Sequence, residues 1–256
     1  MIINYDEIVK QIIGEKLAKP QSGTLSGHAA GEPFDKFVYK AIKDIYPNNT
    51  FRNFEYLNYL YIKNPQATDY QSRINLLGSE VLSLLLSRGR QATINWTPDS
   101  QFVEKQNDTA DIIFKNDSHF DIIDIKTRNM SIKGQAPNII SAYKLANAMK
   151  CMIDTNDFDK LDMVYIGIDW KLEGDHLVVK NTHVKSLFKT NPANLYINWA
   201  AAMQIQFHVQ DLPQSYKFSK EQWAREYLTN FYHQAIKRAN DMKKRFADYF
   251  EDYILD

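Results

Sequence analysis

The stretch Ala110-Asp-Ile-Ile-Phe-Lys-Asn-Asp-Ser-His-Phe-Asp-Ile-Ile-Asp-Ile-Lys126 contains two apolar runs with a polar break between them. Residues 110–114 and 120–126 are rich in isoleucine and phenylalanine, which favour strands, while residues 115–118 are typical of a turn. Two such runs around a turn predict an antiparallel β-hairpin. Three charged residues would be brought together by this hairpin: Asp111, Asp124 and Lys126.

Asp124 and Lys126 lie on the same face of the predicted second strand, because successive side chains alternate between faces. A two-residue loop at Asp117-Ser118 would place Asp111 directly opposite Asp124, on that same face. Carboxylates opposed at about 5 Å destabilise a hairpin unless a cation neutralises them. Mg²⁺ favours one or two carboxylates together with waters and phosphate oxygens, and it lowers the pKa of bound water. The trio therefore predicts a magnesium-dependent site for phosphodiester cleavage; the alternative is a solvated, charged hairpin face.

The triplet of an acid, any residue and a lysine is weakly specific, because it occurs three times in the chain. Asp241-Met-Lys243 lies in a predicted helix, where residues i and i+2 point apart. Asp169-Trp-Lys171 ends a predicted strand and is a genuine rival, but Glu173 and Asp175 follow it and would repel phosphate. Asp124-Ile-Lys126 differs in having a partner carboxylate on a hairpin strand and a basic, acid-free continuation.

The composition indicates a chain that can bury a sizeable core, with 256 residues, 44% of them apolar and 13% aromatic. No repeat or Pro/Gly/Ser-rich linker divides it, so we expect one domain over residues 1–256. No stretch approaches the roughly 18 apolar residues of a membrane span, and no signal peptide is evident. The lone cysteine, Cys151, excludes an internal disulfide and fits a reducing cytoplasm. No phosphate-binding loop is present, so no small-molecule cofactor is expected.

The net charge is zero, from 31 basic and 31 acidic residues, which is unusual for a protein that binds nucleic acid. The charges are unevenly distributed along the chain. Residues 16–31, 81–98, 125–153 and 176–210 contain no Asp or Glu, and the third of these segments directly follows Asp124. Such segregation can give a positive cleft on a neutral protein; ordinary clustering is the alternative.

The remaining patterns mix helices with strands, so the fold class is α/β or mixed α+β. Helices are predicted from Pro33 to Ile45, from Ser79 to Leu86, from Asn138 to Ile153 and onward from Ser219. Further strands are predicted at residues 163–170 and 204–209. The last helix carries an approximate apolar stripe: Tyr227, Phe231, Ile236, Met242, Phe246 and Phe250.

Five blocks of the chain are long and unusual in composition: residues 22–34 (SGTLSGHAAGEPF), 106–111 (QNDTAD), 124–129 (DIKTRN), 135–146 (QAPNIISAYKLA) and 196–209 (YINWAAAMQIQFHV). In this order they closely resemble the HincII/HindII type II restriction endonucleases. The blocks span most of the chain, and they are far more specific than a three-residue motif. The first 20 residues and the last helix match less literally.

The resemblance implies the PD-(D/E)xK nuclease fold, in which helices flank a central mixed sheet. It also implies a bacterial, cytoplasmic homodimer that depends on Mg²⁺ and cuts double-stranded palindromic DNA at the centre of GTYRAC, leaving blunt ends. By position, Asp111 and Asp124 correspond to the metal ligands and Lys126 to the active-site lysine. The proline of the motif is absent, because Ala110 precedes Asp111. The alternatives are another DNA nuclease of this fold, for repair or junction cutting, and a sequence-specific DNA-binding protein with a decayed site.

Several polar residues are candidates for DNA contact. Amide side chains can bond adenine in two places, and the resemblance favours this role for Gln135 and Asn138. The alternative for Asn138 is that it caps the helix it precedes. Asn198 lies in an apolar setting, where a buried amide needs a partner; this can be protein, but the resemblance favours a base. The other candidates are Gln106 and, for the phosphate backbone, Arg88, Arg90, Thr127 and Arg128. The alternative for Arg88 and Arg90 is a solvated helix end.

Two further groups of residues have mainly structural interpretations. Glu32 could assist a metal from the first long helix, but it precedes a proline and suits a helix N-terminus. The six histidines show no zinc-site spacing, so we expect structural roles for them.

Overall fold

The computed structural model describes residues 3–19, 28–105 and 108–253. Its centre is a six-stranded sheet made of β1 (Lys16–Ala18), β2 (Thr50–Phe51), β3 (Ile112–Asn116), β4 (His119–Asn129), β6 (Leu161–Glu173) and β7 (His176–Ser186). The spatial order is β1-β7-β6-β4-β3-β2. The β4–β6 pair is parallel and the other neighbouring pairs are antiparallel, so the sheet is mixed. The apolar run predicted as an interior strand forms β6, between β7 and β4.

The hairpin predicted at residues 110–126 is present as β3 and β4. The pairing register leaves Asp117-Ser118 as a two-residue loop. Asp117 has φ 53°, the left-handed conformation that such loops use and that Asp tolerates better than most residues. The backbone N–H of Asp111 donates to the carbonyl of Ile123 at 3.0 Å, although Ile123 is the register partner of Ile112. Asp111 thus leaves the ladder just before β3, and the predicted direct pairing of Asp111 with Asp124 is not formed.

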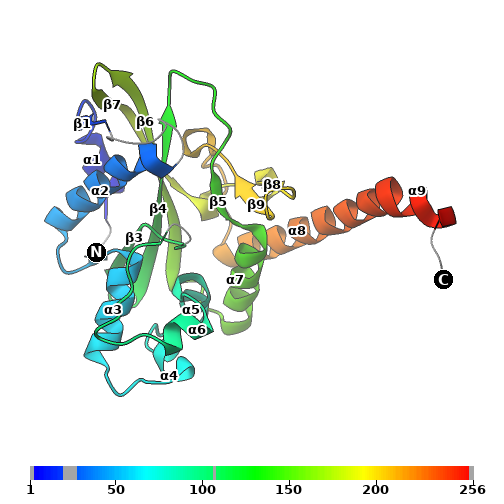
Figure 1. Ribbon diagram of the computed structural model, residues 1–256, viewed down its shortest axis with the longest axis horizontal. Helices are drawn as coiled ribbons and strands as arrows, with labels where there is room; N and C mark the ends of the chain where they lie inside the picture. The colour runs from blue at the N-terminus through cyan, green and yellow to red at the C-terminus, as the bar shows by residue number, and fades with distance from the viewer. Residues whose placement is uncertain (1–2, 20–27, 106–107, 254–256) are drawn as a thin grey trace.

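Helices cover both faces of the central sheet (Figure 1), which confirms the predicted mixed α/β class. On one face, α1 (Tyr5–Lys10) and α2 (His28–Ile45) pack against alternate residues of β3, β4 and β6. The fully buried residues of α2 follow helical spacing: Phe34, Val38 and Ile42. The prediction that this helix starts at Pro33 is wrong, because α2 begins at His28 and contains the proline. Pro33 is the sixth residue of α2 and cannot donate a backbone hydrogen bond there, and the next residue, Phe34, is fully buried against the sheet.

The other face of the sheet carries the larger core. It is covered by α3 (Asn53–Lys63), α5 (Glu80–Leu86), α7 (Ala142–Thr155) and the start of α8 (Lys220–Met242), with α4 (Tyr70–Asn75) and α6 (Arg90–Ile94) outside them. Ser79 caps α5 as predicted, by accepting from the backbone N–H of Leu82 at 3.5 Å. Short 3-10 helices follow β7, at Leu187–Lys189, Pro192–Asn194 and Val209–Asp211.

A second, three-stranded sheet consists of β5 (Asn138–Ser141), β8 (Tyr196–Asn198) and β9 (Gln204–Gln206), in the order β5-β9-β8. The helix predicted from Asn138 therefore begins only at Ala142. Ile140 pairs with Ile205 in β9, a distant partner that sequence periodicity does not reveal. Ser141 is the helix cap, with its hydroxyl accepting from the backbone N–H of Lys144 at 3.4 Å, so the capping alternative for Asn138 is wrong.

The last helix starts within the body of the protein and then projects from it (Figure 1). Ser219 caps α8 as predicted, and Trp223 and Tyr227 are fully buried. The predicted apolar stripe is exposed from Ile236 onward. The chain continues through a π-helical turn (Lys243–Ala247), α9 (Asp248–Phe250) and a 3-10 turn (Glu251–Tyr253). Neither α8 nor any other helix of the described residues combines the length and apolar character that a membrane span needs.

Candidate active site

Asp124 and Lys126 share one face of β4, as strand alternation predicts, and Asp111, which directly precedes β3, lies beside Asp124. Lys126 Nζ lies 2.6 Å from Oδ1 of Asp124. Oδ2 of Asp111 accepts a hydrogen bond from the backbone N–H of Ile125 at 2.7 Å, which turns this carboxylate toward β4. The hairpin thus brings two carboxylates and one ammonium group together.

The electrostatic balance of this trio is unfavourable. Asp124 is only 7% exposed. Burial raises the pKa of Asp124 well above its usual range; Lys126 opposes the rise, and the neighbouring Asp111 carboxylate adds to it. Burial lowers the pKa of Lys126, but the nearby carboxylates outweigh this effect and leave it raised. A further cation beside the carboxylate pair would therefore stabilise the charged form of Asp124.

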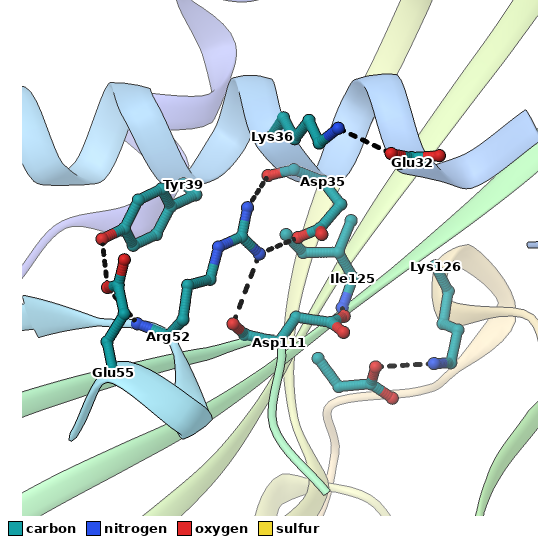
Figure 2. Close-up of polar contacts among 10 residues, drawn as sticks. Glu32, Asp35, Lys36, Tyr39, Arg52, Glu55, Asp111, Ile125 and Lys126 are labelled. Carbon is teal, nitrogen blue, oxygen red and sulfur yellow. Dashed lines mark hydrogen bonds and ion pairs between the residues drawn. The ribbon is translucent and has the colours of Figure 1, made fainter. Parts of the chain in front are cut away.

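A third carboxylate, Asp35 of α2, faces the same place, and Figure 2 shows Arg52 reaching between α2 and Asp111. Arg52 Nη1 donates to Oδ1 of Asp35 at 2.6 Å and to the backbone oxygen of Asp111 at 3.3 Å. Burial raises the pKa of Asp35 to about 6, with a further contribution from Asp111 and opposition from Arg52. Arg52 thus ties α2 to the residue that supplies the first carboxylate. We call Asp35, Asp111, Asp124 and Lys126 the cleft cluster.

Arg52 is itself held in place by Tyr39 and Glu55 (Figure 2). Its guanidinium carbon lies 4.2 Å from the centre of the Tyr39 ring. The Tyr39 hydroxyl donates to Oε2 of Glu55 at 2.6 Å, and the same oxygen accepts from the backbone N–H of Arg52 at 2.9 Å. Sequence reasoning missed Asp35 and Arg52, because their contacts with Asp111 join distant segments. The one signal in the sequence was that Asp35 is a charged residue next to the buried apolar residues of α2.

The cleft cluster opens into a cleft of about 890 Å³, lined also by the segment from Ile132 to Ser141. Four of the predicted DNA-contact residues line this cleft: Thr127, Arg128, Gln135 and Asn138. Gln135 and Asn138 are exposed and Thr127 is half-buried. Glu32 lines it too, and its carboxylate pairs with Lys36 at 2.6 Å on the surface of α2. The cleft therefore joins the acidic cluster to amide side chains that can contact a nucleic acid.

An amide side chain of β9, Gln206, connects two of the predicted contact residues. Its Nε2 donates to Oδ1 of Asn138 at 2.8 Å, and its Oε1 accepts from Nδ2 of Asn198 at 3.1 Å. Oδ1 of Asn198 accepts from the backbone N–H of Ala200 at 3.1 Å. In this structure the partners of Asn198 are thus protein groups, and it does not line the cleft. Sequence reasoning missed Gln206, although its alternation in the predicted strand was visible.

The remaining predicted contact residues lie away from the cleft or are engaged. Gln106 falls outside the described residues. Arg90 is the first residue of α6, and its guanidinium carbon lies 5.5 Å from the centre of the Tyr70 ring. Arg88 has a side chain only 4% exposed and forms an ion pair with Asp108, so its expected contact with phosphate is wrong.

The rival triplet on β6 is occupied by ion pairs. Asp169 is 3% exposed, and Arg128 binds it through two nitrogens, at 2.8 and 3.0 Å. His183 Nε2 lies 3.2 Å from the same carboxylate. Lys171 is exposed at the strand end. Asp169 therefore has a cationic partner within the fold, and that partner is Arg128, which was predicted to contact the DNA backbone.

A different acidic cluster lies nearer the start of β4. His119 Nε2 lies 3.1 Å from Oδ1 of Asp121 and 3.5 Å from Oδ2 of Asp162, and we call these three residues the His119 cluster. Their ligand atoms all lie within 4.8 Å of one another, so the cluster could hold a metal ion. The Tyr5 hydroxyl donates to Asp121, however, and Lys220 Nζ lies 3.1 Å from Asp162. Its charges are therefore largely balanced within the protein.

The family model described as "Restriction endonuclease HincII" matches residues 8–254. The chain belongs to this family. The type II restriction enzyme HindII of Haemophilus influenzae (strain Rd) is 51% identical over 251 residues, which cover 98% of this chain and 97% of that enzyme. The type II restriction enzyme HincII of Haemophilus influenzae is 50% identical, with the same coverage. The NlaIV restriction endonuclease superposes with a TM-score of 0.42 and 9% identity, over 90% of this chain and 87% of that one.

The family match confirms the resemblance drawn from the five sequence blocks. It also extends through the last helix, where those blocks give little information. Its named relatives are type II restriction enzymes, and the chain is a restriction endonuclease of this family. The cleft cluster is accordingly the candidate for its active site.

Proposed function

We propose that the chain makes Mg²⁺-dependent double-strand cuts in palindromic DNA at GTYRAC and leaves blunt ends. The observation that carries this proposal is the cleft cluster: a carboxylate pair at the end of the hairpin, with a lysine 2.6 Å from one of the two carboxylates, in an open cleft. The sequence specificity rests on the likeness to the two Haemophilus enzymes, each about half identical to this chain.

The residues of the cleft cluster fit a divalent cation with oxygen ligands. Asp111 and Asp124 offer carboxylate oxygens, and Asp35 adds a third acidic group close by. Lys126 and Arg52 supply the cationic groups that touch them, so three carboxylates face two positive charges. When bound there, Mg²⁺ would lower the pKa of an attacking water and stabilise negative charge on the phosphate.

The protein groups would hold the reacting atoms in position. Asp111 is fixed by the N–H of Ile125 and by Arg52, so its carboxylate is pre-oriented before any ligand enters. Lys126 reaches the same point with its positive charge, where it can donate to a phosphate oxygen or to the attacking water. Placement of both groups on a rigid hairpin supports accurate in-line attack.

The DNA contacts that we propose lie around the cleft. Gln135 and Asn138 would reach base edges, since both amides are exposed at its rim, while Thr127 would contact the backbone beside the cut. Asn198 would act with Asn138 through Gln206, because the three amides are hydrogen-bonded in a row. Gln106 and Arg90 are proposed as outer contacts on the sequence resemblance alone.

A palindromic site has two-fold symmetry, so we propose a homodimer with one cleft for each strand. We also propose that residues 1–256 act as one domain in a bacterial cytoplasm. Both statements follow from the family and from the composition rather than from a measured property.

One plasmid of known sequence, incubated with the protein and Mg²⁺, tests the proposal. Discrete blunt-ended fragments that end at GTYRAC sites are expected. Cuts at other positions would contradict the GTYRAC specificity and support a different DNA nuclease of the same fold. Binding to the plasmid without cutting, under conditions where HincII cuts, would contradict the assignment of catalysis to the cleft cluster.

A further inference from the structure

A second pocket lies at the turn of the β3–β4 hairpin, between this turn, α3 and α5, and we call it the hairpin-turn pocket. Its volume is about 560 Å³, which suits a small molecule. Phe120, one of its lining residues, precedes Asp124 by four positions on β4, which is about 13 Å along the strand. No described residue lines both this pocket and the cleft. The hairpin-turn pocket is therefore a site of its own.

The hairpin-turn pocket carries an excess of positive charge. Three lysines line it from separate segments: Lys63 at the end of α3, Lys115 of β3, and Lys160 just before β6. Among the described residues, none of these three ammonium groups has an ion-pair partner. The one acidic residue of the lining, Asp117, is exposed. A concave surface with unbalanced charge of one sign attracts counter-ions, so this pocket favours an anion.

A buried tyrosine adds an unused hydrogen-bond donor to the lining. Tyr56 is 2% exposed, and its ring is held between those of Phe51 and Phe120, with centres 5.4 and 5.6 Å away. Its hydroxyl forms no hydrogen bond with any other residue that the structure describes. A hydroxyl in a side chain this buried needs a partner. An anion in the pocket can supply one, because its oxygens accept hydrogen bonds.

The lining also offers aromatic surface. Phe51 and Tyr59 both line the pocket, and their rings lie 5.7 Å apart at an angle of 34°. Tyr59 is 46% exposed, so its ring is open to a ligand. Exposed aromatic rings of this kind stack on nucleic-acid bases. The pocket therefore combines groups that bind an anion with groups that bind a flat ring.

We propose that the hairpin-turn pocket binds a single nucleotide. Its phosphate lies among the three lysines and accepts from the Tyr56 hydroxyl, and its base lies against Tyr59. An inorganic anion would leave the aromatic surface unused, and an uncharged aromatic molecule would leave the lysines unbalanced. The nucleotide has two possible sources: a free mononucleotide, or the unpaired last nucleotide of a DNA strand. The inference goes beyond the proposed function, because no residue of the cleft takes part.

Calorimetric titration of deoxyadenosine monophosphate (dAMP) into the full chain, in EDTA, tests the ligand class. We expect a dissociation constant of at most about 1 mM. Deoxyadenosine and inorganic phosphate should each bind at least about tenfold more weakly, because each lacks one half of the contacts. Failure of dAMP to bind, or equal binding of dAMP and either fragment, would overturn the proposal.

Variants locate the bound dAMP. Tyr56→Phe keeps the packed ring and removes only the hydroxyl, and it should weaken dAMP binding about tenfold. Lys115→Ala should weaken it at least about fivefold. Lys10→Ala, on α1 across the sheet, and Lys126→Ala, in the cleft, should bind dAMP like the wild type. Unchanged melting temperatures would show that the variants are folded. Lost binding in Lys126→Ala with normal binding in Tyr56→Phe would place dAMP in the cleft and overturn the proposal.

Competition separates the two sources of the nucleotide. The competitors are a blunt duplex without a GTYRAC site and the same duplex with one unpaired 3′ nucleotide. Displacement of dAMP by the second duplex alone would support a DNA end as the source, and displacement by neither would support a free mononucleotide. Equal displacement by both would place dAMP on the surface that binds duplex and overturn the proposal. Because no cleavage is measured, failure of the plasmid digest would leave these results intact.

Discussion

Strand β4 contributes to two clusters of acidic side chains that balance their charge differently. In the His119 cluster, two carboxylates share an imidazole and are also bound by a tyrosine hydroxyl and an ammonium group. In the cleft cluster, three carboxylates share one lysine and one arginine and open into a cleft. A cluster that balances its own charge stabilises the fold, whereas one with excess negative charge is suited to holding a cation. Substitutions should therefore affect stability in one and activity in the other.

The largest expected effect is on cleavage when the cleft cluster loses a member. Asp124→Asn removes a charged cation ligand, and Lys126→Ala removes the ammonium group at the same point. Each should lower the single-turnover cleavage rate by at least about 10³-fold. The fold should persist, because both side chains face the cleft rather than the apolar core. Cleavage of a duplex with one GTYRAC site, followed beside a thermal unfolding curve, separates the two effects.

Arg52 should give a smaller loss of activity, because it acts through Asp111. Arg52→Met removes its hydrogen bonds to Asp35 and to the backbone of Asp111. We expect the cleavage rate to fall roughly 10- to 100-fold with little change in DNA affinity. Arg52→Lys should recover part of the rate. A variant that loses DNA affinity and rate together, with a much lower melting temperature, would indicate a purely structural role.

The His119 cluster should respond in stability rather than in rate. Asp121 is 9% exposed and accepts hydrogen bonds from Tyr5 and His119. Asp121→Asn keeps its shape but loses the charge, and we expect unfolding free energy to fall by about 1–3 kcal/mol. Urea denaturation measures this loss. At a temperature well below the unfolding transition, the cleavage rate of Asp121→Asn should stay within about twofold of the wild-type rate. A much larger loss of rate would indicate that this cluster holds the catalytic metal.

The smallest expected effect is a pH dependence at His119. Its hydrogen bond to Asp121 raises the pKa of His119; burial opposes the rise, and the Asp159 carbonyl and the two carboxylates support it. A raised pKa in the folded state stabilises the protein below the unfolded pKa of about 6.5, and this stabilisation is lost as the pH rises through the folded pKa.

The wild type should therefore exceed His119→Gln in stability at pH 5.5, by under about 1 kcal/mol because the ring is partly exposed. The difference should shrink at pH 9. Urea denaturation of both proteins at the two pH values measures it. A difference that grows with pH would show that His119 is neutral in the folded protein.

The hairpin was predictable because its determinants are local. Alternation places Asp124 and Lys126 on one face, and the two-residue loop brings the start of β3 beside them. The departure of Asp111 from the ladder just before β3 was not predictable from this pattern. The outer residues of the site were not predictable in the same way. Asp35, Arg52 and Gln206 reach their partners across long sequence separations, and nothing in their own neighbourhood specifies those contacts.

Two other differences have the same origin. Residues 138–141 continue the helical apolar pattern of residues 142–153, but pairing with β9 makes them a strand. The last helix does carry apolar residues at helical spacing, but this periodicity indicates only that one side of the helix is apolar. It cannot show that the body of the protein covers Tyr227 and leaves Phe246 in solvent.

Calorimetric titration of Mg²⁺ into the wild type, Asp124→Asn and Asp121→Asn tests the contrast between the two clusters most directly. If the cleft cluster holds the cation, the wild type and Asp121→Asn bind Mg²⁺ alike, and Asp124→Asn loses at least tenfold in affinity. Normal binding by Asp124→Asn together with lost binding by Asp121→Asn would place the metal in the His119 cluster and contradict the account.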